Sequence, residues 1–444
     1  MPEKYYIIGA GVAGITAAEQ IRRTAPTAEI WVVNGEHYPF YRRLSLSSYL
    51  QGQTSLEALI VKQPQDYAAL NIQVIQDRAI ALQPTTQTLT LAERGDLPYD
   101  GLIIATGGSA IKPPLPGIEL EGVNLGYWDM VHTLWYEENA KKYAGKQAVV
   151  IGGGVLGLEL ADCLNHAGMA VTIVQLGQTL GEPLTDHAAG KILYDRVVAS
   201  GVAVHLGVSA LEILGNEGKV AGVKLSNGLE IGADLVGVCI GIRPNLSWLG
   251  GSGIEITQGA IAVDQFLQTN LPRVYAAGDC TLVQTGNTVG DRPNRTWQVA
   301  TSQGIVAAAN LLGAATVYQE GLFYNAGVLY DLPYTMLGKF NPDPSDRTCQ
   351  TYTYDPGDDP YAYFKLTVSE HGLLVGAMLL GKQRRTNILR KIIEGNYLVT
   401  GHEQELMDSK FKPTGLPTAD VAIAGDAEVE AKLAAYDKSG AADR

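Results

Sequence analysis

The chain has 444 residues, of which 46% are hydrophobic and 18% charged, so it is long enough for two or three globular domains. Its formal net charge of −13 argues against general nucleic-acid binding, which needs an excess of positive charge. No apolar run approaches the roughly 20 residues that span a bilayer. A strand-like run begins as early as Tyr5, before any secretory signal could fit. We therefore expect a soluble cytoplasmic protein.

The first predicted unit is a strand, a glycine-rich turn, a helix and a second strand. The strand covers residues 5–8, and the turn reads GAGVAG. Gly9 permits the tight turn, Gly11 lets backbone N–H groups approach a pyrophosphate, and Gly14 lets the helix pack against the strand. The phosphates would lie at the helix N-terminus, where unpaired N–H groups favour anions.

The second strand of this unit, residues 30–33, ends at Asn34, Gly35 and Glu36. Dinucleotide folds usually have an acidic residue here that binds ribose hydroxyls. Glu36 is the candidate for that role.

The same pattern recurs later in the chain. A strand at residues 148–151 leads into GGGVLG at 152–157, a helix to about Ala167 and a strand at 170–174. One such turn is weak evidence, but two with the same flanking elements predict two Rossmann-like three-layer dinucleotide-binding domains of the α/β class.

The second unit departs from the usual pattern at one place. Gln175 stands where an acid is expected, and residues 176–179 offer no arginine for a 2′-phosphate. The second fold therefore binds NAD(P)H weakly, binds it without discrimination, or binds another nucleotide.

Four further segments carry a family resemblance: YPFYRRLSLSSYL at 38–50, YDGLIIATG at 99–107, VYAAGDC at 274–280, and the helical run 297–310. With the two glycine turns, they resemble the FAD-dependent pyridine nucleotide reductases, particularly the rubredoxin and ferredoxin reductase branch. The chain is similar to the N-terminal reductase portion of NADH-dependent nitrite reductase. The resemblance covers roughly residues 4 to 400.

The resemblance implies the domain organisation. The FAD-binding domain would be discontinuous, at residues 1–115 and 250–318, with the NAD(P)H-type domain at 116–249 inserted in it. A small C-terminal α+β domain would cover residues 319–411, with strands near 362–368 and 373–380 and a helix at 386–394. Residues 412–444 are expected to form a flexible acidic tail.

The resemblance also implies the site residues. Arg43 would face the phosphates and Asp279 would bind a ribityl hydroxyl. The family usually has its ribose-binding acid at the Gly35 position. Glu36, one residue later, would take over that role here. The FAD-contacting set is Gly9, Gly11, Ala13, Gly14, Asn34, Glu36, Arg42, Arg43, Ser47, Ala105, Thr106, Gly107, Gly278, Asp279 and Trp297. The nicotinamide-nucleotide set is Gly152, Gly154, Val155, Gly157, Gln175 and Gly241.

Glu159 matches a glutamate that the family has near the nicotinamide and flavin, and it is the candidate catalytic residue. Ser48 occupies the position of its frequent lysine partner. An unpaired, partly buried carboxyl has reason to hold a proton. The four cysteines are widely separated and none lies in the 45–48 segment, so neither thiol chemistry nor a metal site is expected.

The expected function is electron transfer from NAD(P)H, through non-covalently bound FAD, to a rubredoxin-like or ferredoxin-like carrier or a quinone-like acceptor. A cationic run at Lys382, Arg384 and Arg385 is a candidate docking patch for an acidic carrier, and a homodimer is possible. Two alternatives stay open: a non-enzymatic FAD-binding sensor or interaction protein, and a flavoprotein with a different nucleotide in its second site.

Overall fold

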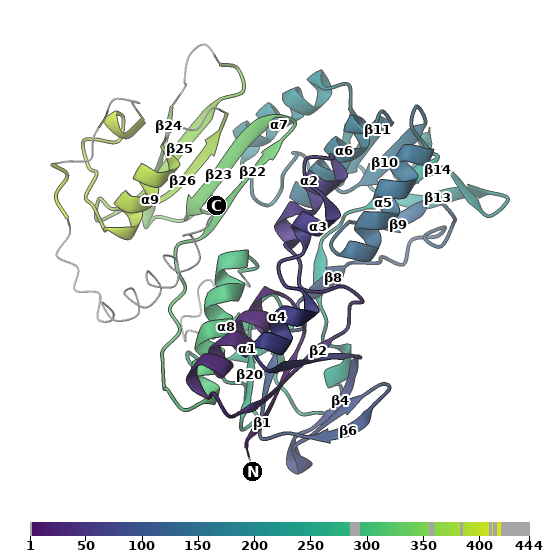
Figure 1. The fold of residues 1–444 in the computed structure, drawn as a ribbon. Coiled ribbons are helices and arrows are strands. Elements are labelled where there is room, and N and C mark those ends of the chain that lie inside the picture. The colour runs from purple at the N-terminus through teal and green to yellow at the C-terminus, as the bar shows by residue number, and fades with distance from the viewer. Residues whose placement is uncertain are drawn as a thin grey trace.

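The computed structural model describes residues 2–284, 294–354, 359–381, 385–407, 411 and 415–418. Figure 1 shows three bodies, one around β1 near the N-terminus, one around β10 and one around β23 and α9.

The first body is built on a five-stranded parallel sheet in the order β20-β7-β1-β2-β3. Parallel sheets are usually covered on both faces, and their strands are then apolar throughout. Residues 5–8 and 101–104 are accordingly buried. The strands are β1 (Lys4–Ile8), β2 (Glu29–Asn34), β3 (Ile72–Gln76), β7 (Gly101–Ile104) and β20 (Val274–Ala276).

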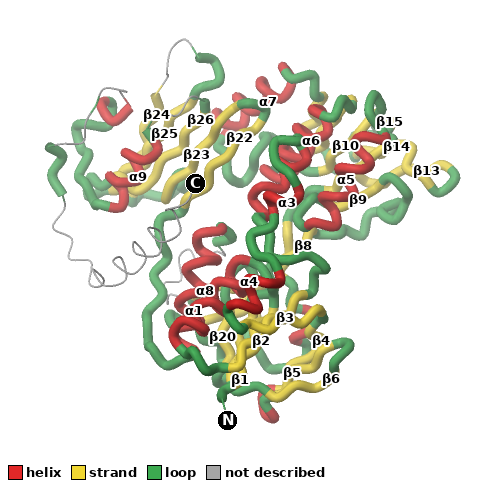
Figure 2. Tube along the Cα trace, in the orientation of Figure 1, coloured by secondary structure: helices red, strands yellow, loops and turns green. Residues whose placement is uncertain are grey.

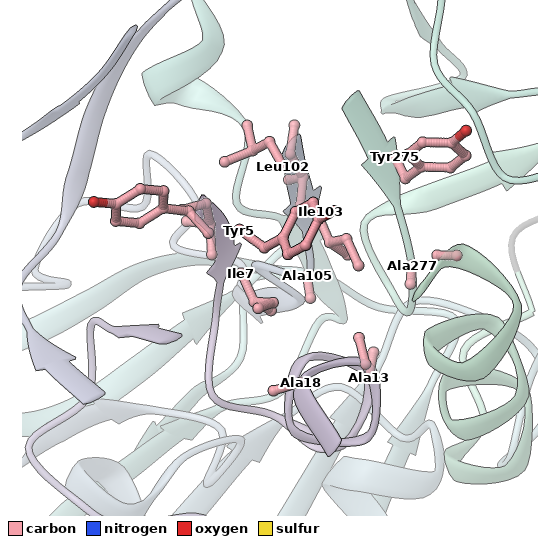
Figure 3. Packing of buried hydrophobic residues seen from close by; sticks show 14 of the residues in the cluster. Tyr5, Ile7, Ala13, Ala18, Leu102, Ile103, Ala105, Tyr275 and Ala277 are labelled. Atoms are coloured by element: carbon pink, nitrogen blue, oxygen red, sulfur yellow. The ribbon is translucent and has the colours of Figure 1, made fainter. Parts of the chain in front are cut away.

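Two helices, α1 (Val12–Thr24) and α8 (Trp297–Leu311), lie side by side against this sheet (Figures 1 and 2). Small residues allow their close approach, since a Cβ on Gly304 would lie 2.4 Å from the carbonyl oxygen of Ala13. Figure 3 shows alanine side chains of α1, Ala13 and Ala18, in the packed layer near Ile7. Larger side chains there would force the helices apart.

Two small sheets of short strands complete this body. β4 (Ala79–Gln83), β5 (Thr88–Leu91) and β6 (Gly95–Pro98) form one sheet and add Leu82, Leu89 and Leu91 to the same buried cluster. A second small sheet joins β18 (Ile256–Thr257), β19 (Ala260–Val263) and β21 (Thr281–Val283).

The second body repeats this architecture with a parallel sheet in the order β12-β11-β10-β16-β9. All its strands lie between β7 and β20 in the sequence, so the second dinucleotide-type domain is inserted in the first, as predicted. The strands are β9 (Val123–Leu125), β10 (Gln147–Ile151), β11 (Ala170–Gln175), β12 (Ala203–Leu206) and β16 (Leu235–Val238). The other elements are α5 (Met130–Lys142), α6 (Val155–His166), α7 (His187–Ala199), β13 (Ala210–Asn216), β14 (Lys219–Leu225) and β15 (Glu230–Gly232).

The chain enters and leaves the second body through a two-stranded antiparallel ribbon. β8 (Gly108–Ala110) pairs with β17 (Ile242–Pro244). This crossing lies several residues before the expected boundaries at 115/116 and 249/250. A Cβ on Gly108 would lie 2.9 Å from the carbonyl oxygen of Arg243, so the two strands are closely apposed.

A helical segment after β2 also bridges the first two bodies. It contains α2 (Leu46–Leu50), α3 (Leu56–Leu59) and α4 (Pro64–Ala69). Tyr49 donates a hydrogen bond to Glu137 of α5 (3.0 Å), and Gln51 donates one to Asp162 of α6 (3.0 Å).

The third body is a five-stranded antiparallel sheet in the order β22-β23-β26-β25-β24, packed against α9 (Thr386–Glu394). Its strands are β22 (Tyr324–Leu329), β23 (Leu332–Gly338), β24 (Cys349–Tyr354), β25 (Tyr363–Ser369) and β26 (Leu374–Leu380). The predicted hairpin and helix of this α+β domain are confirmed.

The structure corrects two details of the predictions for the C-terminal part. Arg385 is buried and donates hydrogen bonds to the carbonyls of Leu406 (2.7 Å) and Phe411, so its guanidinium cannot dock a carrier. Residues 415–418, assigned to the flexible tail, instead pair with the domain: Leu398 N–H donates to Pro417 (2.8 Å), and Leu416 is buried. Lys382, Arg384 and residues 419–444 lie outside the described residues.

Among the described residues, no helix has the length and apolar character needed to cross a membrane.

A partly buried ion pair joins the second and third bodies. Lys365 of β25 is 5% exposed, and its ammonium lies 2.5 Å from Asp186 and 2.9 Å from Asn341. Asp186 also accepts from Tyr363 (2.8 Å) and caps α7 through the Ala189 N–H (2.9 Å). Burial alone would raise the pKa of the Asp186 carboxyl, but these donors hold it below its ordinary value.

Replacing Asp186 by Asn should destabilise the protein by about 3 kcal/mol, because the Lys365 charge would remain buried without its partner. The depressed pKa implies that this contribution is present at neutral pH and is lost as the pH falls through the folded-state pKa. Chemical unfolding at pH 7 measures the loss of stability in the variant. A repeat at pH 3 measures how much of that difference disappears on acidification. Asp195→Asn, an exposed carboxylate on the same helix, is the control and should cost below about 1 kcal/mol. Equal losses in the two variants would contradict the assignment.

Candidate functional site

A cavity of about 540 Å³ opens at the carboxyl ends of β1, β2, β7 and β20. Open parallel sheets bind ligands at this edge, where the strand order reverses. Of the FAD-contacting set from the sequence, the structure brings to this cavity Gly9, Gly11, Ala13, Asn34, Glu36, Arg43, Ser47, Ala105, Thr106, Gly107, Gly278, Asp279 and Trp297. Arg42 and Gly14 are not in its lining.

The first glycine turn has the geometry that its sequence requires. Gly9 has a φ of +115°, and a Cβ there would lie 2.1 Å from the carbonyl oxygen of Ala105. A Cβ on Gly14 would lie 1.9 Å from the carbonyl oxygen of Gly9, so Gly14 allows the helix to pack. Gly11 is the N-cap of α1 and faces open space, with no side-chain cap. The N–H groups of the first turn are therefore free to bind an anion.

The end of β2 is internally hydrogen-bonded. Asn34 is buried, and its side chain holds the turn by donating to the Tyr38 carbonyl (2.9 Å) and accepting from the Glu36 N–H (3.1 Å). The Glu36 carboxylate accepts from the Tyr41 hydroxyl (2.7 Å) and pairs with Arg43 (2.8 Å). Asn34 and Glu36 both line the cavity, and Glu36 also orients the Arg43 guanidinium.

Arg43 is the cation that this network presents to the cavity. Besides Glu36, its guanidinium donates to the carbonyl of Trp128 and lies over the rings of Tyr41 (5.1 Å) and Trp128 (5.6 Å). Arg42 is exposed outside the cavity, so the structure does not support the expectation that it contacts the cofactor.

Asp279 lines the cavity together with Arg43 and Arg295. Burial raises the pKa of the Asp279 carboxyl, while Arg43 and Arg295 act to lower it. Arg295 also lines the cavity, and its buried Nε has no hydrogen-bond partner among the described residues. Trp297 stacks on Phe40, with ring centroids 5.8 Å apart, and forms part of the wall.

Sequence reasoning missed Arg295, Arg78, Tyr127 and Trp128, all of which line the cavity. None lies in a glycine turn. The one available signal was a cation two residues before Trp297, at the start of the helix expected beside the flavin.

Glu159 reaches the same cavity from the second body. It lies on α6, and the buried Tyr127 hydroxyl donates a hydrogen bond to its Oε2. Burial raises the pKa of the Glu159 carboxyl, the Tyr127 hydroxyl lowers it, and the Asp162 carboxylate raises it, with a net increase. In the described part of the chain, no lysine or arginine forms an ion pair with Glu159.

The second glycine turn repeats the first. Gly152 has a φ of +110°, and its Cβ would lie 2.2 Å from the carbonyl oxygen of Cys239. A Cβ on Gly157 would lie 1.9 Å from the carbonyl oxygen of Gly152. Gly154 caps α6 without a side-chain hydrogen bond, and Val155 begins that helix.

The remaining second-fold residues lie near this turn. The Gln175 amide oxygen accepts from the Gly153 N–H (2.8 Å). Gly241, with a φ of +113°, follows the end of β16 by three residues.

All four cysteines are free thiols. Burial raises the pKa of Cys163, Cys239, Cys280 and Cys349, and it raises that of Cys280 to about 11. A raised pKa lowers the thiolate fraction and with it the nucleophilicity.

The fold and the two glycine turns define a protein with two dinucleotide-type domains, one inserted in the other. Residues 3–304 match the family described as pyridine nucleotide-disulphide oxidoreductase. The chain belongs to this family.

The chain is also similar to several individual proteins. The chain is 30% identical over 393 residues to a nitrite reductase [NAD(P)H] of Bacillus subtilis, covering 87% of this chain and 47% of that protein. It is 30% identical to a rubredoxin-NAD(+) reductase of Pseudomonas putida, covering 70% and 80%. A ferredoxin reductase for the CYP199A2 system from Rhodopseudomonas palustris superposes with a TM-score of 0.77 at 26% identity, covering 85% and 91%. The chain spans about half the length of the first curated relatives that it matches.

Replacing Glu159 by Gln should stabilise the protein at alkaline pH by on the order of 1 kcal/mol. A carboxyl whose pKa is higher in the folded than in the unfolded chain loses stability as the pH rises from the unfolded to the folded value. The amide of E159Q is neutral throughout, so the variant should match the wild type near pH 4 and exceed it near pH 9.

Thermal unfolding across this range checks the prediction. Glu212→Gln, at an exposed carboxylate of β13, is the control and should leave the pH profile unchanged. A profile for E159Q that parallels the wild type would mean that Glu159 ionises in the folded protein without cost.

Proposed function

We propose that the chain is an FAD-dependent oxidoreductase that passes electrons from NAD(P)H through flavin to a small electron carrier or a quinone-like acceptor. The observation that carries the proposal is the position of α6. This helix begins at the second glycine turn, and its residues Leu156 and Glu159 line the cavity of the first fold. The two dinucleotide-type sites therefore adjoin each other.

The first cavity fits a flavin dinucleotide. Its volume is in the range of ligand pockets, roughly 300–1,000 Å³. The free N–H groups at Gly11 suit a pyrophosphate, and Arg43 and Arg295 supply positive charge. The buried Nε of Arg295 has no partner among the described residues, and a phosphate or ribityl oxygen would satisfy it.

Each of these residues has a distinct task in the proposal. The glycine turn binds the pyrophosphate, Asp279 accepts hydrogen bonds from ribityl hydroxyls, and the Phe40–Trp297 pair excludes water from one wall. FAD held by these residues would supply two-electron chemistry with a nicotinamide and one-electron chemistry with a carrier.

Glu159 can hold a proton at its Oε atoms near the junction of the two sites. Its raised pKa favours the protonated form more than in water, and Tyr127 fixes the carboxyl in one orientation. It would thus adjust the local charge without a covalent role.

The names of the relatives support an electron-carrier acceptor: several are rubredoxin or ferredoxin reductases. The carrier would dock near Lys382 and Arg384, with Arg385 excluded by its burial. A homodimer is part of the proposal. Because the chain spans less than half of the nitrite reductase relative, nitrite reduction by this chain alone is not proposed.

Anaerobic titration tests the proposed activity. The purified protein should show flavin absorption that NADH or NADPH bleaches within seconds at submillimolar concentrations. A flavoprotein that neither nucleotide bleaches at millimolar concentration would contradict the reductase and favour the sensor. A second flavin per chain would favour a different nucleotide in the second fold.

Replacing Arg295 by Gln should weaken FAD retention by roughly tenfold or more, because a charged hydrogen bond contributes about 1.5–3 kcal/mol. The flavin-to-protein ratio after dialysis, and the affinity of the apoprotein for added FAD, measure this. Arg347→Gln, at an exposed arginine of the third body, is the control. If the FAD affinity of R295Q is unchanged, Arg295 does not contribute to FAD binding.

A further inference from the structure

We propose that Glu182 is the specificity-determining carboxylate of the second fold, where it takes the role of the acid absent at Gln175 and selects NADH over NADPH. The inference rests on the proposed function, since it assigns the adenosine-ribose end of the nucleotide to that fold. Glu182 lies in the loop between β11 and α7, seven residues beyond the end of β11.

Gln175 cannot itself provide the acceptor that a ribose diol needs. Its amide oxygen is already used by the Gly153 N–H, at 2.8 Å. The amide nitrogen is only a donor, so it cannot replace a carboxylate oxygen. The strand end therefore contributes a structural link to the glycine turn and lacks a free carboxylate.

The loop returns Glu182 to this strand end. A Cβ placed on Gly177 would lie 1.8 Å from Oε2 of Glu182 and 2.8 Å from Nε2 of Gln175, so the carboxylate and the amide are neighbours at Gly177. The Thr179 hydroxyl donates to the other carboxylate oxygen, Oε1, at 2.7 Å and fixes its orientation. Oε2 is left to accept from a ligand.

The same loop contacts the glycine turn. The Gly181 N–H donates to the Gly153 carbonyl at 2.7 Å, and the Glu182 carbonyl oxygen would lie 3.4 Å from a Cβ on Gly154. Gly154 is the uncapped N-cap of α6, where a pyrophosphate would bind. The carboxylate and the anion-binding turn thus belong to one subsite.

The charge of this subsite discriminates between the two nucleotides. A carboxylate accepts hydrogen bonds from ribose hydroxyls but repels a 2′-phosphate, which needs arginine or lysine instead. No lysine or arginine occurs between Gln175 and Gly190. The next cation, Lys191, pairs with Asp195 at 2.7 Å.

Direct binding tests the inference without relying on turnover. Calorimetry on the FAD-loaded protein with ADP-ribose and with 2′-phospho-ADP-ribose should show wild-type preference for ADP-ribose. Glu182→Gln should weaken ADP-ribose binding roughly ten- to hundredfold, because a charged hydrogen bond is lost. It should weaken 2′-phospho-ADP-ribose binding less or not at all. In stopped-flow reduction, NADH should show a higher half-saturating concentration with an unchanged limiting rate.

A second variant keeps the test independent of the folding of E182Q. Gly177→Ala leaves the carboxylate in the chain but displaces it by the added Cβ, and it should reproduce the loss. Glu212→Gln is the matched control and should change neither affinity.

Wild-type preference for 2′-phospho-ADP-ribose, or unchanged selectivity in both Glu182→Gln and Gly177→Ala, would overturn the inference. If the protein binds ADP-ribose selectively but NADH does not bleach the flavin, the role proposed for Glu182 stands and the proposed reductase activity is wrong. If the wild type binds neither ligand, both the role proposed for Glu182 and the use of NAD(P)H as the electron donor are wrong.

Discussion

Close backbone packing at the two glycine turns is the constraint on which the rest of this structure depends. At Gly9 and at Gly152, the turn that leaves the first strand touches the carbonyl of the residue that follows a neighbouring strand, with no space for a Cβ. This contact fixes the following helix so that its free N–H groups face the carboxyl edge of the sheet. A methyl group at either place would move the helix, and the anion-binding edge would be lost with it.

The first cavity belongs to two domains. Tyr127, Trp128, Leu156 and Glu159 line it from the inserted domain. The ribbon of β8 and β17 connects the domains covalently, and the Trp128 indole donates to the Gly108 carbonyl at 2.8 Å beside that ribbon. Arg43 completes the link by binding Glu36 of the first domain and the Trp128 carbonyl of the second. A rotation of one domain against the other would therefore alter the charge at the cavity.

The sequence predicted the fold well because short stretches of residues determine the glycine turns and the elements beside them. Both glycine turns, their flanking strands and helices, the insertion and the C-terminal hairpin follow from short stretches of sequence. The pattern does not determine which side chains face the cavity. Arg42 and Arg43 are adjacent and chemically alike, yet only Arg43 turns inward, where Glu36 and the Trp128 carbonyl receive it. The sequence around Arg385 is that of a surface cation, but the carbonyls of Leu406 and Phe411 bind it in the interior.

The residues that sequence reasoning missed come from loops whose path depends on the whole fold. Arg295 precedes α8, and the loop after β11 brings the Glu182 carboxylate back beside the Gln175 amide at Gly177. A fixed-spacing rule finds an acid only at the end of the strand, so a carboxylate delivered by a later loop escapes it. The neutral Gln175 then suggests a defective site, although the negative charge has moved only a few residues along the chain.

Helix α6 connects the second glycine turn with the cavity of the first fold. Its N-terminus faces the second glycine turn, and Glu159 follows Val155 by about one turn, which is roughly 6 Å along the axis. A nucleotide bound at the start of α6 would therefore end close to the cavity of the first fold. Tyr127 holds Glu159 at that junction, and burial raises the pKa of the Glu159 carboxyl. A carboxyl with a raised pKa takes up a proton at this junction more readily than it would in water.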